Sequence, residues 1–195
     1  MRALLALCLL LLCDPAHAKA RPGHVHWDLF GEEDILMGFK AGPQVVGYTA
    51  IQTSTAIIDV QSSMRASIGT SVQFVYAVPR FEFDFLLNTR GGINTRESLY
   101  SVAVPVILKF AAEGDKDVDF FAGPGIQPEF VLFGFEPHSG FIYGVLGTIG
   151  LSADLPPFVF EFELRYVVGI SNIADSLNGA RPRDFQMLGG IMWHF

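Results

Sequence analysis

The stretch Phe158-Val159-Phe160-Glu161-Phe162-Glu163-Leu164-Arg165-Tyr166-Val167-Val168-Gly169-Ile170 alternates between two kinds of side chain. One set of alternate positions is apolar or aromatic: Phe158, Phe160, Phe162, Leu164, Tyr166, Val168 and Ile170. The other set includes Glu161, Glu163 and Arg165. Side chains of a β-strand point alternately to its two sides. A period of two therefore predicts a strand with one apolar face and one charged face.

Two other segments repeat this alternation. In 81–88 the odd positions are Phe, Phe, Phe and Leu, and the even positions include Glu82 and Asp84. In the last segment the apolar face comprises Phe185, Met187, Gly189, Ile191, Trp193 and Phe195. Less regular segments complete eight predicted strands, at 35–46, 65–77, 99–111, 118–132 and 141–152. Prolines inside strands lack a backbone donor, so bulges are expected at Pro43, Pro105, Pro124 and Pro128.

The first 18 residues read as a secretory signal peptide. Arg2 supplies the positive charge, an apolar stretch follows to Cys13, and Ala16-His17-Ala18 forms a small-x-small cleavage site. Residues 19–34 are then a periplasmic N-terminal lead-in, and residues 35–195 are the main domain. Lipidation of Cys13 is the alternative, although Leu12 stands where a small residue is usual. Both cysteines lie in the removed segment, so no disulfide is expected.

Alternation alone does not say which face points outward, because soluble sandwiches and barrels alternate too. The secretory signal, the lack of disulfide partners and the terminal aromatic residue favour a membrane barrel, whose apolar strand faces contact lipid. The strands match the roughly 9 to 11 residues that a tilted strand needs to cross a bilayer. No segment has the roughly 18 consecutive apolar residues of a spanning helix. The sequence therefore predicts an all-β fold, an eight-stranded antiparallel up-and-down transmembrane β-barrel.

The connections between the predicted strands alternate in length. Short turns are expected at 78–80, 113–117 and 154–157, and longer loops at 47–63, 88–98, 133–140 and 171–184. Outer-membrane barrels keep short turns on the periplasmic side and long loops outside. An even strand number then predicts that both termini are periplasmic. The first long loop is rich in Thr and Ile, which favours a hairpin that extends past the bilayer and offers a sheet edge to a partner.

Four short motifs follow one another along these strands. They are Gly38-Phe39-Lys40-Ala41-Gly42, Val104-Pro105-Val106-Ile107-Leu108-Lys109-Phe110, Phe120-Phe121-Ala122-Gly123-Pro124-Gly125, and Leu164-Arg165-Tyr166 with Gly169-Ile170. Together they resemble the outer-membrane β-barrel domain of the porin family, which includes PorT-like proteins and is similar to OmpX-like small barrels. The resemblance covers about 35–195. It implies a location in the bacterial outer membrane, with outer-membrane lipid around the barrel.

The carboxyl terminus resembles the signal that the barrel-assembly machinery reads. Phe195 matches the terminal aromatic residue, Trp193 the aromatic residue two positions earlier, and Gly190 the glycine before them. Leu188 departs from the usual polar position. The resemblance implies that the barrel-assembly machinery is a partner during biogenesis.

Carrying the alternation through all strands predicts which side chains point into the barrel. The charged members are Lys40, Glu82, Asp84, Arg90, Lys109, Glu129, Glu161, Glu163 and Arg165, accompanied by Gln44, Gln73 and Gln127. Side chains just fill the interior of an eight-stranded barrel, and buried charges need partners. The pattern predicts a cross-strand ion-pair network that plugs the lumen. A charged passage for small ions is the alternative.

Other residues with chemical potential do not form a complete site. Two carboxyl pairs lie two residues apart, Glu82 with Asp84 and Glu161 with Glu163. Their spacing of about 7 Å overlaps that of glycosidase acid/base pairs, but a filled lumen offers a sugar no cleft. His24 and His26 lack a third metal ligand, and His138 has no acidic partner identifiable by spacing. The chain is expected to be no enzyme and to hold no metal or cofactor.

The expected function is a structural or interaction role of a small outer-membrane barrel, exerted through its extracellular loops. Its protein partner would be extracellular or periplasmic and is not identified by the sequence. The family resemblance implies a different class, a narrow transport or secretion-accessory barrel. A hydrolase with its active residues in a loop is a third class. A formal charge of -7 without a basic patch argues against nucleic acid as a partner.

Overall fold

The computed structural model describes residues 34–48, 51–52, 57–58, 63–76, 79–91, 98–113, 118–133, 140–172 and 181–195. The expected signal peptide, nearly all of the lead-in and the histidines at 24, 26 and 138 lie outside these residues. Within the described ranges, no helix is long and apolar enough to span a bilayer.

All the described regular structure is β-strand. The segments are β1 (Asp34–Tyr48), β2 (Ile51–Gln52), β3 (Ile57–Ile58), β4 (Ser63–Val75), β5 (Pro79–Gly91), β6 (Ser98–Ala103), β7 (Val106–Glu113), β8 (Val118–Phe133), β9 (Phe141–Leu155), β10 (Phe158–Gly169) and β11 (Pro182–His194). The predicted strands are thus found, most of them one to three residues longer at their ends. Pro79 and Arg80, expected in a turn, belong to β5 because their backbones pair with Phe110 and Lys109.

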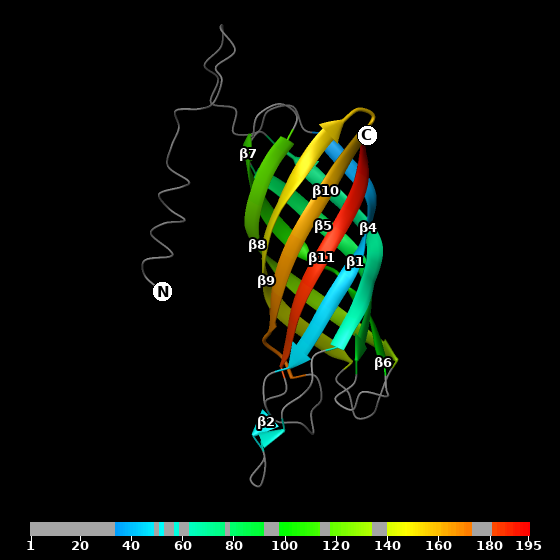
Figure 1. The fold of residues 1–195 in the computed structure, drawn as a ribbon, viewed down its shortest axis with the longest axis vertical. Coiled ribbons are helices and arrows are strands. Elements are labelled where there is room, and N and C mark those ends of the chain that lie inside the picture. Colours follow the sequence, from blue (N-terminus) through cyan, green and yellow to red (C-terminus); the bar gives the residue numbers. More distant parts are fainter. Residues whose placement is uncertain are drawn as a thin grey trace, which may run out of the picture.

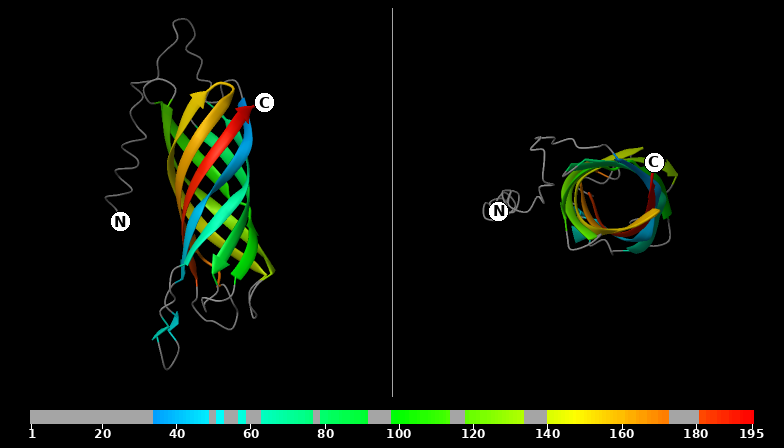
Figure 2. Two further views of the ribbon diagram at one scale, coloured as in Figure 1. Left: turned by 45° about the vertical axis from the view of Figure 1, so that its right-hand side comes forward. Right: turned by 90° about the horizontal axis from the view of Figure 1, so that it is seen from above.

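The long strands close into a barrel (Figure 1). Each pairs antiparallel with its neighbours in the chain, and β11 pairs with β1 from Leu36↔His194 to Tyr48↔Pro182. β6 and β7 share one strand position between β5 and β8, so the barrel has eight strand positions. The view along the axis in Figure 2 shows the closed ring. The predicted eight-stranded antiparallel barrel is confirmed.

The strand position shared by β6 and β7 is interrupted at Val104 and Pro105. Proline has no N–H to donate to a strand partner. The carbonyl of Pro105 still accepts from the N–H of Asp84 at 3.1 Å, and the N–H of Val104 donates to the carbonyl of Pro128 at 2.9 Å. The wall therefore stays continuous. The bulges expected at the four prolines are not found, since the register is the same before and after each of them.

The apolar faces of the strands point outward and the charged faces inward. In β10 the phenylalanines at 158, 160 and 162 are exposed, whereas the side chains of Glu163 and Arg165 are buried. On the outer face, Phe85 is 60% exposed and Ile149 is 57% exposed. A soluble barrel has the opposite arrangement. This exterior is that of a barrel surrounded by hydrocarbon.

The two ends of the barrel differ. β1 begins and β11 ends at one end, which we call the terminal rim, together with the short connection between β9 and β10 (Figure 1). There the N–H of Phe195 donates to the carbonyl of Ile35 at 2.9 Å. The opposite end, the loop rim, carries the two-stranded sheet of β2 and β3, which lies beyond the barrel. The first long loop thus contains a hairpin, as its composition favours.

Candidate functional site

Seven charged side chains meet inside the barrel, and we call them the lumen ion-pair cluster: Lys40, Glu82, Asp84, Lys109, Glu161, Glu163 and Arg165. They come from β1, β5, β7 and β10. Each occupies an inward position of its strand because of the period-two pattern. All seven are buried, with Glu161 the most exposed at 5%.

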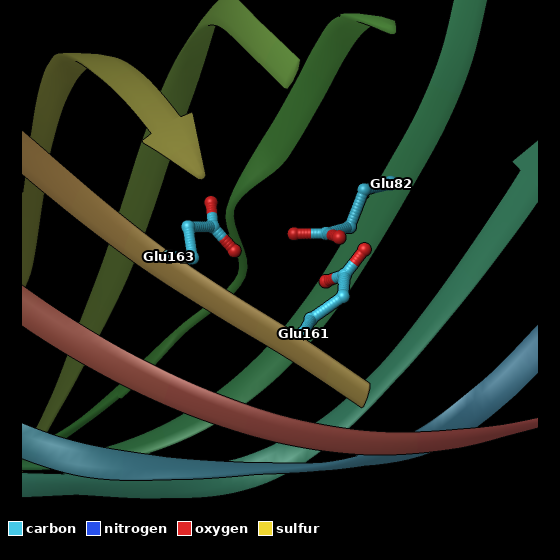
Figure 3. Close-up of side chains that lie close together, drawn as sticks. All are labelled: Glu82, Glu161 and Glu163. Atoms are coloured by element: carbon cyan, nitrogen blue, oxygen red, sulfur yellow. The ribbon is translucent and has the colours of Figure 1, made fainter. Parts of the chain in front are cut away.

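Three carboxylates form the centre of the cluster. Figure 3 shows Glu82 on one strand pointing toward Glu161 and Glu163 on another. One carboxylate oxygen from each lies within 4.8 Å of the other two. This is closer than the roughly 7 Å expected from strand geometry alone, because the side chains converge on shared cations.

Two lysine ammonium groups hold these carboxylates together. Lys40 Nζ lies 2.7 Å from Glu82, 3.0 Å from Glu161 and 2.9 Å from Glu163. Lys109 Nζ lies 2.6 Å, 3.3 Å and 3.4 Å from the same three residues. Three convergent carboxylates are a donor set for a hard cation. Here the protein supplies the cations itself, and the ammonium groups stand where a metal ion would bind.

Arg165 connects the two sides of the lumen. Its guanidinium reaches Glu82 on β5, Asp84 on β5 and Glu163 on its own strand, each at 2.6 Å. Thr148 donates to Glu163 at 2.6 Å from β9, and Gln73 donates to Glu161 at 2.8 Å from β4. Polar groups of six strands are therefore linked in one network.

Other buried side chains lie between the cluster and the terminal rim. Leu36, Val159 and Met192 form a buried apolar group there. Lys109 lies 4.0 Å from the ring centroid of Phe121, in a cation–π contact. A separate ion pair joins Arg80 to Asp119, and Arg80 also donates to Ser152 at 3.2 Å.

Buried uncharged polar residues lie on the loop-rim side of the cluster, and we call them the amide layer: Gln44, Ser67, Asn88, Gln127 and Gln186. Ser67 Oγ lies 2.8 Å from Gln44 Oε1 and 2.7 Å from Asn88 Oδ1. Among the described residues, neither amide atom of Gln186 has a hydrogen-bond partner, and the same holds for Gln44 Nε2 and Asn88 Nδ2.

One of the expected network residues, Glu129, lies apart from the cluster. Glu129 is buried beside Ser101 and Gln127, which both donate to it. The side chain of Arg90 lies outside the part of the chain that is described.

Sequence reasoning missed several residues of the lumen. The sequence pattern places Arg80 in a turn and Asp184 in a loop, although both lie on inward positions of strands. Extending the alternation of the final strand back from Gln186 by two residues identifies Asp184. Asp119 follows from the alternation of β8 in the same way. The pairing of Arg80 with Asp119 has no signal in the sequence, because it depends on how the strands are staggered.

This architecture is similar to that of known proteins, although the sequence is not. No family model matches the sequence, and no curated protein matches it. Solved structures do match. The crystal structure of neisserial surface protein A is 16% identical with a TM-score of 0.62, and the match covers 83% of this chain and 97% of that one. The fold is that of a small outer-membrane β-barrel.

Two further structures have the same small-barrel fold. The outer membrane protein OprG from Pseudomonas aeruginosa is 11% identical with a TM-score of 0.51, over 83% of this chain and 95% of that chain. The N-terminal β-barrel domain of Pseudomonas aeruginosa OprF is 8% identical with a TM-score of 0.53, over 85% and 99%. At these identities the likeness is one of fold, so the function has to be argued from the chain's own residues.

Proposed function

We propose that this chain is an integral barrel of the bacterial outer membrane that acts as a structural or interaction protein, with a lumen closed by its own side chains. The observation that carries this proposal is the lumen ion-pair cluster. It joins facing walls of the barrel through buried ion pairs, such as Arg165 to Glu82 at 2.6 Å. The chain then has no enzymatic role, and its specificity lies in the extracellular loops.

A closed lumen follows from the energetics of the cluster. A hydrated ion would have to separate pairs whose partners are fully buried. Removing one partner of a buried pair costs about 3 to 5 kcal/mol, because the other charge is left uncompensated. The cluster therefore holds the facing walls of the barrel together. In a narrow transport or secretion-accessory barrel, these ion pairs would have to separate.

Membrane insertion is supported by the exterior and by closure of the sheet. An open sheet edge in hydrocarbon would leave backbone donors and acceptors unsatisfied, and pairing of β11 with β1 removes that edge. Trp193 packs against Phe39 and Phe195 near the terminal rim, at ring-centroid distances of 5.9 Å and 6.2 Å. Such aromatic residues are typical of the interfacial girdles of membrane barrels.

The terminal rim is proposed to face the periplasm. Short connections lie on the periplasmic side of outer-membrane barrels and long loops on the extracellular side. β9 and β10 are joined at the terminal rim by Pro156 and Pro157 alone. Phe195 is 73% exposed and lies beside Trp193. With Gly190 they are proposed to form the signal for the barrel-assembly machinery.

Insertion is tested by fractionating cells that express the full chain. We expect the protein in the Sarkosyl-insoluble outer-membrane fraction. We also expect its band on gels to shift when the sample is boiled, because a folded barrel resists detergent. Extraction with the inner membrane, together with identical migration before and after boiling, would contradict the proposal.

The interaction role is tested on the first loop. Deleting residues 50–58 removes the hairpin of β2 and β3 but leaves the barrel strands intact. Surface adhesion or co-purification of a partner should fall, while the heat-dependent band shift is retained. Unchanged adhesion and co-purification would exclude this loop as the contact surface.

A further inference from the structure

A groove on the outer wall of the barrel is the strongest unassigned feature. It has a volume of about 320 Å³ and lies where β5, β7 and β8 adjoin. Its lining includes Phe81 from β5, Val106 and Leu108 from β7, and Pro124, Gly125 and Ile126 from β8. All the lining side chains are apolar.

The groove has a local cause in the sequence. β7 begins only after the break at Val104 and Pro105. Its pairing with β8 includes Ile107↔Gly125 and is next recorded at Phe110↔Ala122. Pro124 lies between these two recorded pairs and has no N–H to donate.

Gly125, next to Pro124, leaves no side chain on the inner face of the wall at this position. A Cβ there would lie 2.6 Å from the carbonyl oxygen of Val106, and 3.1 Å from both Ile107 Cγ1 and Leu146 Cδ1. Ile107 and Leu146 belong to a buried apolar group inside the barrel. The inner side of this wall is therefore apolar at Ile107, whereas Glu82, which pairs with Ile107, belongs to the lumen ion-pair cluster.

The surroundings of the groove determine what can occupy it. Every outward residue from 79 to 87 on β5, from 106 to 112 on β7 and from 120 to 132 on β8 is apolar. The groove is thus continuous with the lipid-facing surface and has no charged side chain to hold a headgroup. Only a hydrocarbon chain matches such a lining.

The direction of the groove favours one leaflet. Its lining runs from Ile126, which pairs with Val106, to Phe81, which pairs with Leu108. Phe81 lies two residues from the start of β5. β5 starts at the terminal rim, because Arg80 pairs with Val75, which in turn pairs with Asp34 at the start of β1. A chain that enters along the groove therefore comes from the leaflet at the terminal rim, which is the phospholipid leaflet of an outer membrane.

We propose that the groove binds one acyl chain of a phospholipid and retains it as a fixed part of the barrel. This inference rests on the proposed insertion in the outer membrane with the terminal rim in the periplasm. A retained chain covers the wall beside Pro124, where the apolar surface is indented. Other lipids around the barrel exchange freely.

Native mass spectrometry of the full chain, purified in mild detergent from its membrane, tests this proposal. We expect one phospholipid per wild-type barrel, identified by its mass. Val106→Trp fills the groove and should lower this occupancy by about tenfold, the effect of losing a few methylene contacts. Ile191→Trp is the matched control, because Ile191 is an outward apolar residue on β11, which adjoins none of the strands that line the groove. Its occupancy should equal that of the wild type.

Several outcomes overturn the proposal: a lipid-free wild type, retained lipopolysaccharide in place of phospholipid, or equal occupancy in the wild type and Val106→Trp. The heat-dependent band shift is measured for each protein, and Leu108→Phe serves as a second filling variant if Val106→Trp does not fold. A barrel that inserts and folds but carries no phospholipid contradicts this inference and leaves the proposed function intact. Failure to reach the outer membrane contradicts the proposed function instead.

Discussion

The lumen has two polar regions that are buried to the same degree and bonded very differently. In the lumen ion-pair cluster, Lys40 and Arg165 each make three ion pairs at 3.0 Å or less. In the amide layer, Gln186 has no hydrogen-bond partner among the described residues and Gln44 leaves its amino group unpartnered. Burial alone therefore does not show which part of the lumen stabilises the barrel.

The difference follows from the chemistry of the side chains. Several acids can share one ammonium or guanidinium, so a few long cationic side chains balance the charge of several carboxylates. A carboxamide has two donors and an acceptor in a fixed plane, and the surrounding strands must provide matching groups. The cluster is expected to be sensitive to substitution, and the amide layer tolerant of it.

Arg165→Met is expected to have the largest effect. It leaves two lysines facing four carboxylates in the cluster, with Asp84 deprived of its arginine partner. Breaking a buried pair in this way costs about 3 to 5 kcal/mol. Urea unfolding of the barrel in phospholipid vesicles measures the loss of stability. A loss of unfolding free energy below about 1 kcal/mol would mean that the cluster does not hold the barrel walls together.

Ile149→Arg sharpens the comparison by testing which face is inside. Ile149 is an outward residue near the middle of β9, whereas Leu155 ends the same strand at the terminal rim. An arginine on the lipid face costs about 2 to 4 kcal/mol at the bilayer midplane and about 0 to 1 kcal/mol near the interface. We therefore expect Ile149→Arg to be clearly less stable than Leu155→Arg in the same vesicles. Equal effects of the two would contradict the lipid-facing exterior.

Gly69→Ala tests how tightly the strands approach beside the cluster. Gly69 pairs with Lys40, and a Cβ at this position would overlap the carbonyl oxygen of Phe85. Such crowding costs about 1 to 3 kcal/mol. At Gly147 a Cβ meets no atom within 4 Å, so Gly147→Ala is the control and should leave stability unchanged. Similar unfolding midpoints for both variants would show that the close approach at Gly69 is unimportant.

Gln186→Leu is expected to have the smallest effect. It removes a buried amide that has no partner among the described residues. Replacing an unsatisfied polar group by an apolar one is neutral or stabilising, here by up to about 1 kcal/mol. The same vesicle assay measures it. A loss comparable to that of Arg165→Met would erase the distinction between the two regions.

The fold could be predicted because one period governs the whole chain. Alternation in β5, β10 and β11 indicates strands with two distinct faces, and alternating connection lengths indicate an up-and-down barrel. The missing donor at Pro105 predicts a bulge, whereas the structure has a break in the strand at Val104 and Pro105 without a change of register. Pro124 and Pro128 lie in regular strands, since each loses only one ladder bond while its other neighbour still pairs.

The arrangement of the lumen was less accessible to sequence reasoning. Alternation indicates that Glu82 and Glu163 point inward, but not that both reach Lys40. That convergence depends on the stagger of strands far apart in the sequence, which brings β1, β5 and β10 to one level. Strand ends were the other weakness. Arg80 and Asp184 were missed because the strands continue further than the apolar pattern does.

Conductance in a planar bilayer tests the closed lumen most directly. The reconstituted wild-type chain should show no reproducible unitary currents. Glu82→Ser combined with Lys109→Ser removes a pair at 2.6 Å together with its bulk, so discrete currents should appear. Gln186→Ser, a similar truncation in the amide layer, should stay silent. Reproducible currents through the wild type, unchanged when the Glu82 and Lys109 pair is removed, would contradict a lumen closed by the ion-pair cluster.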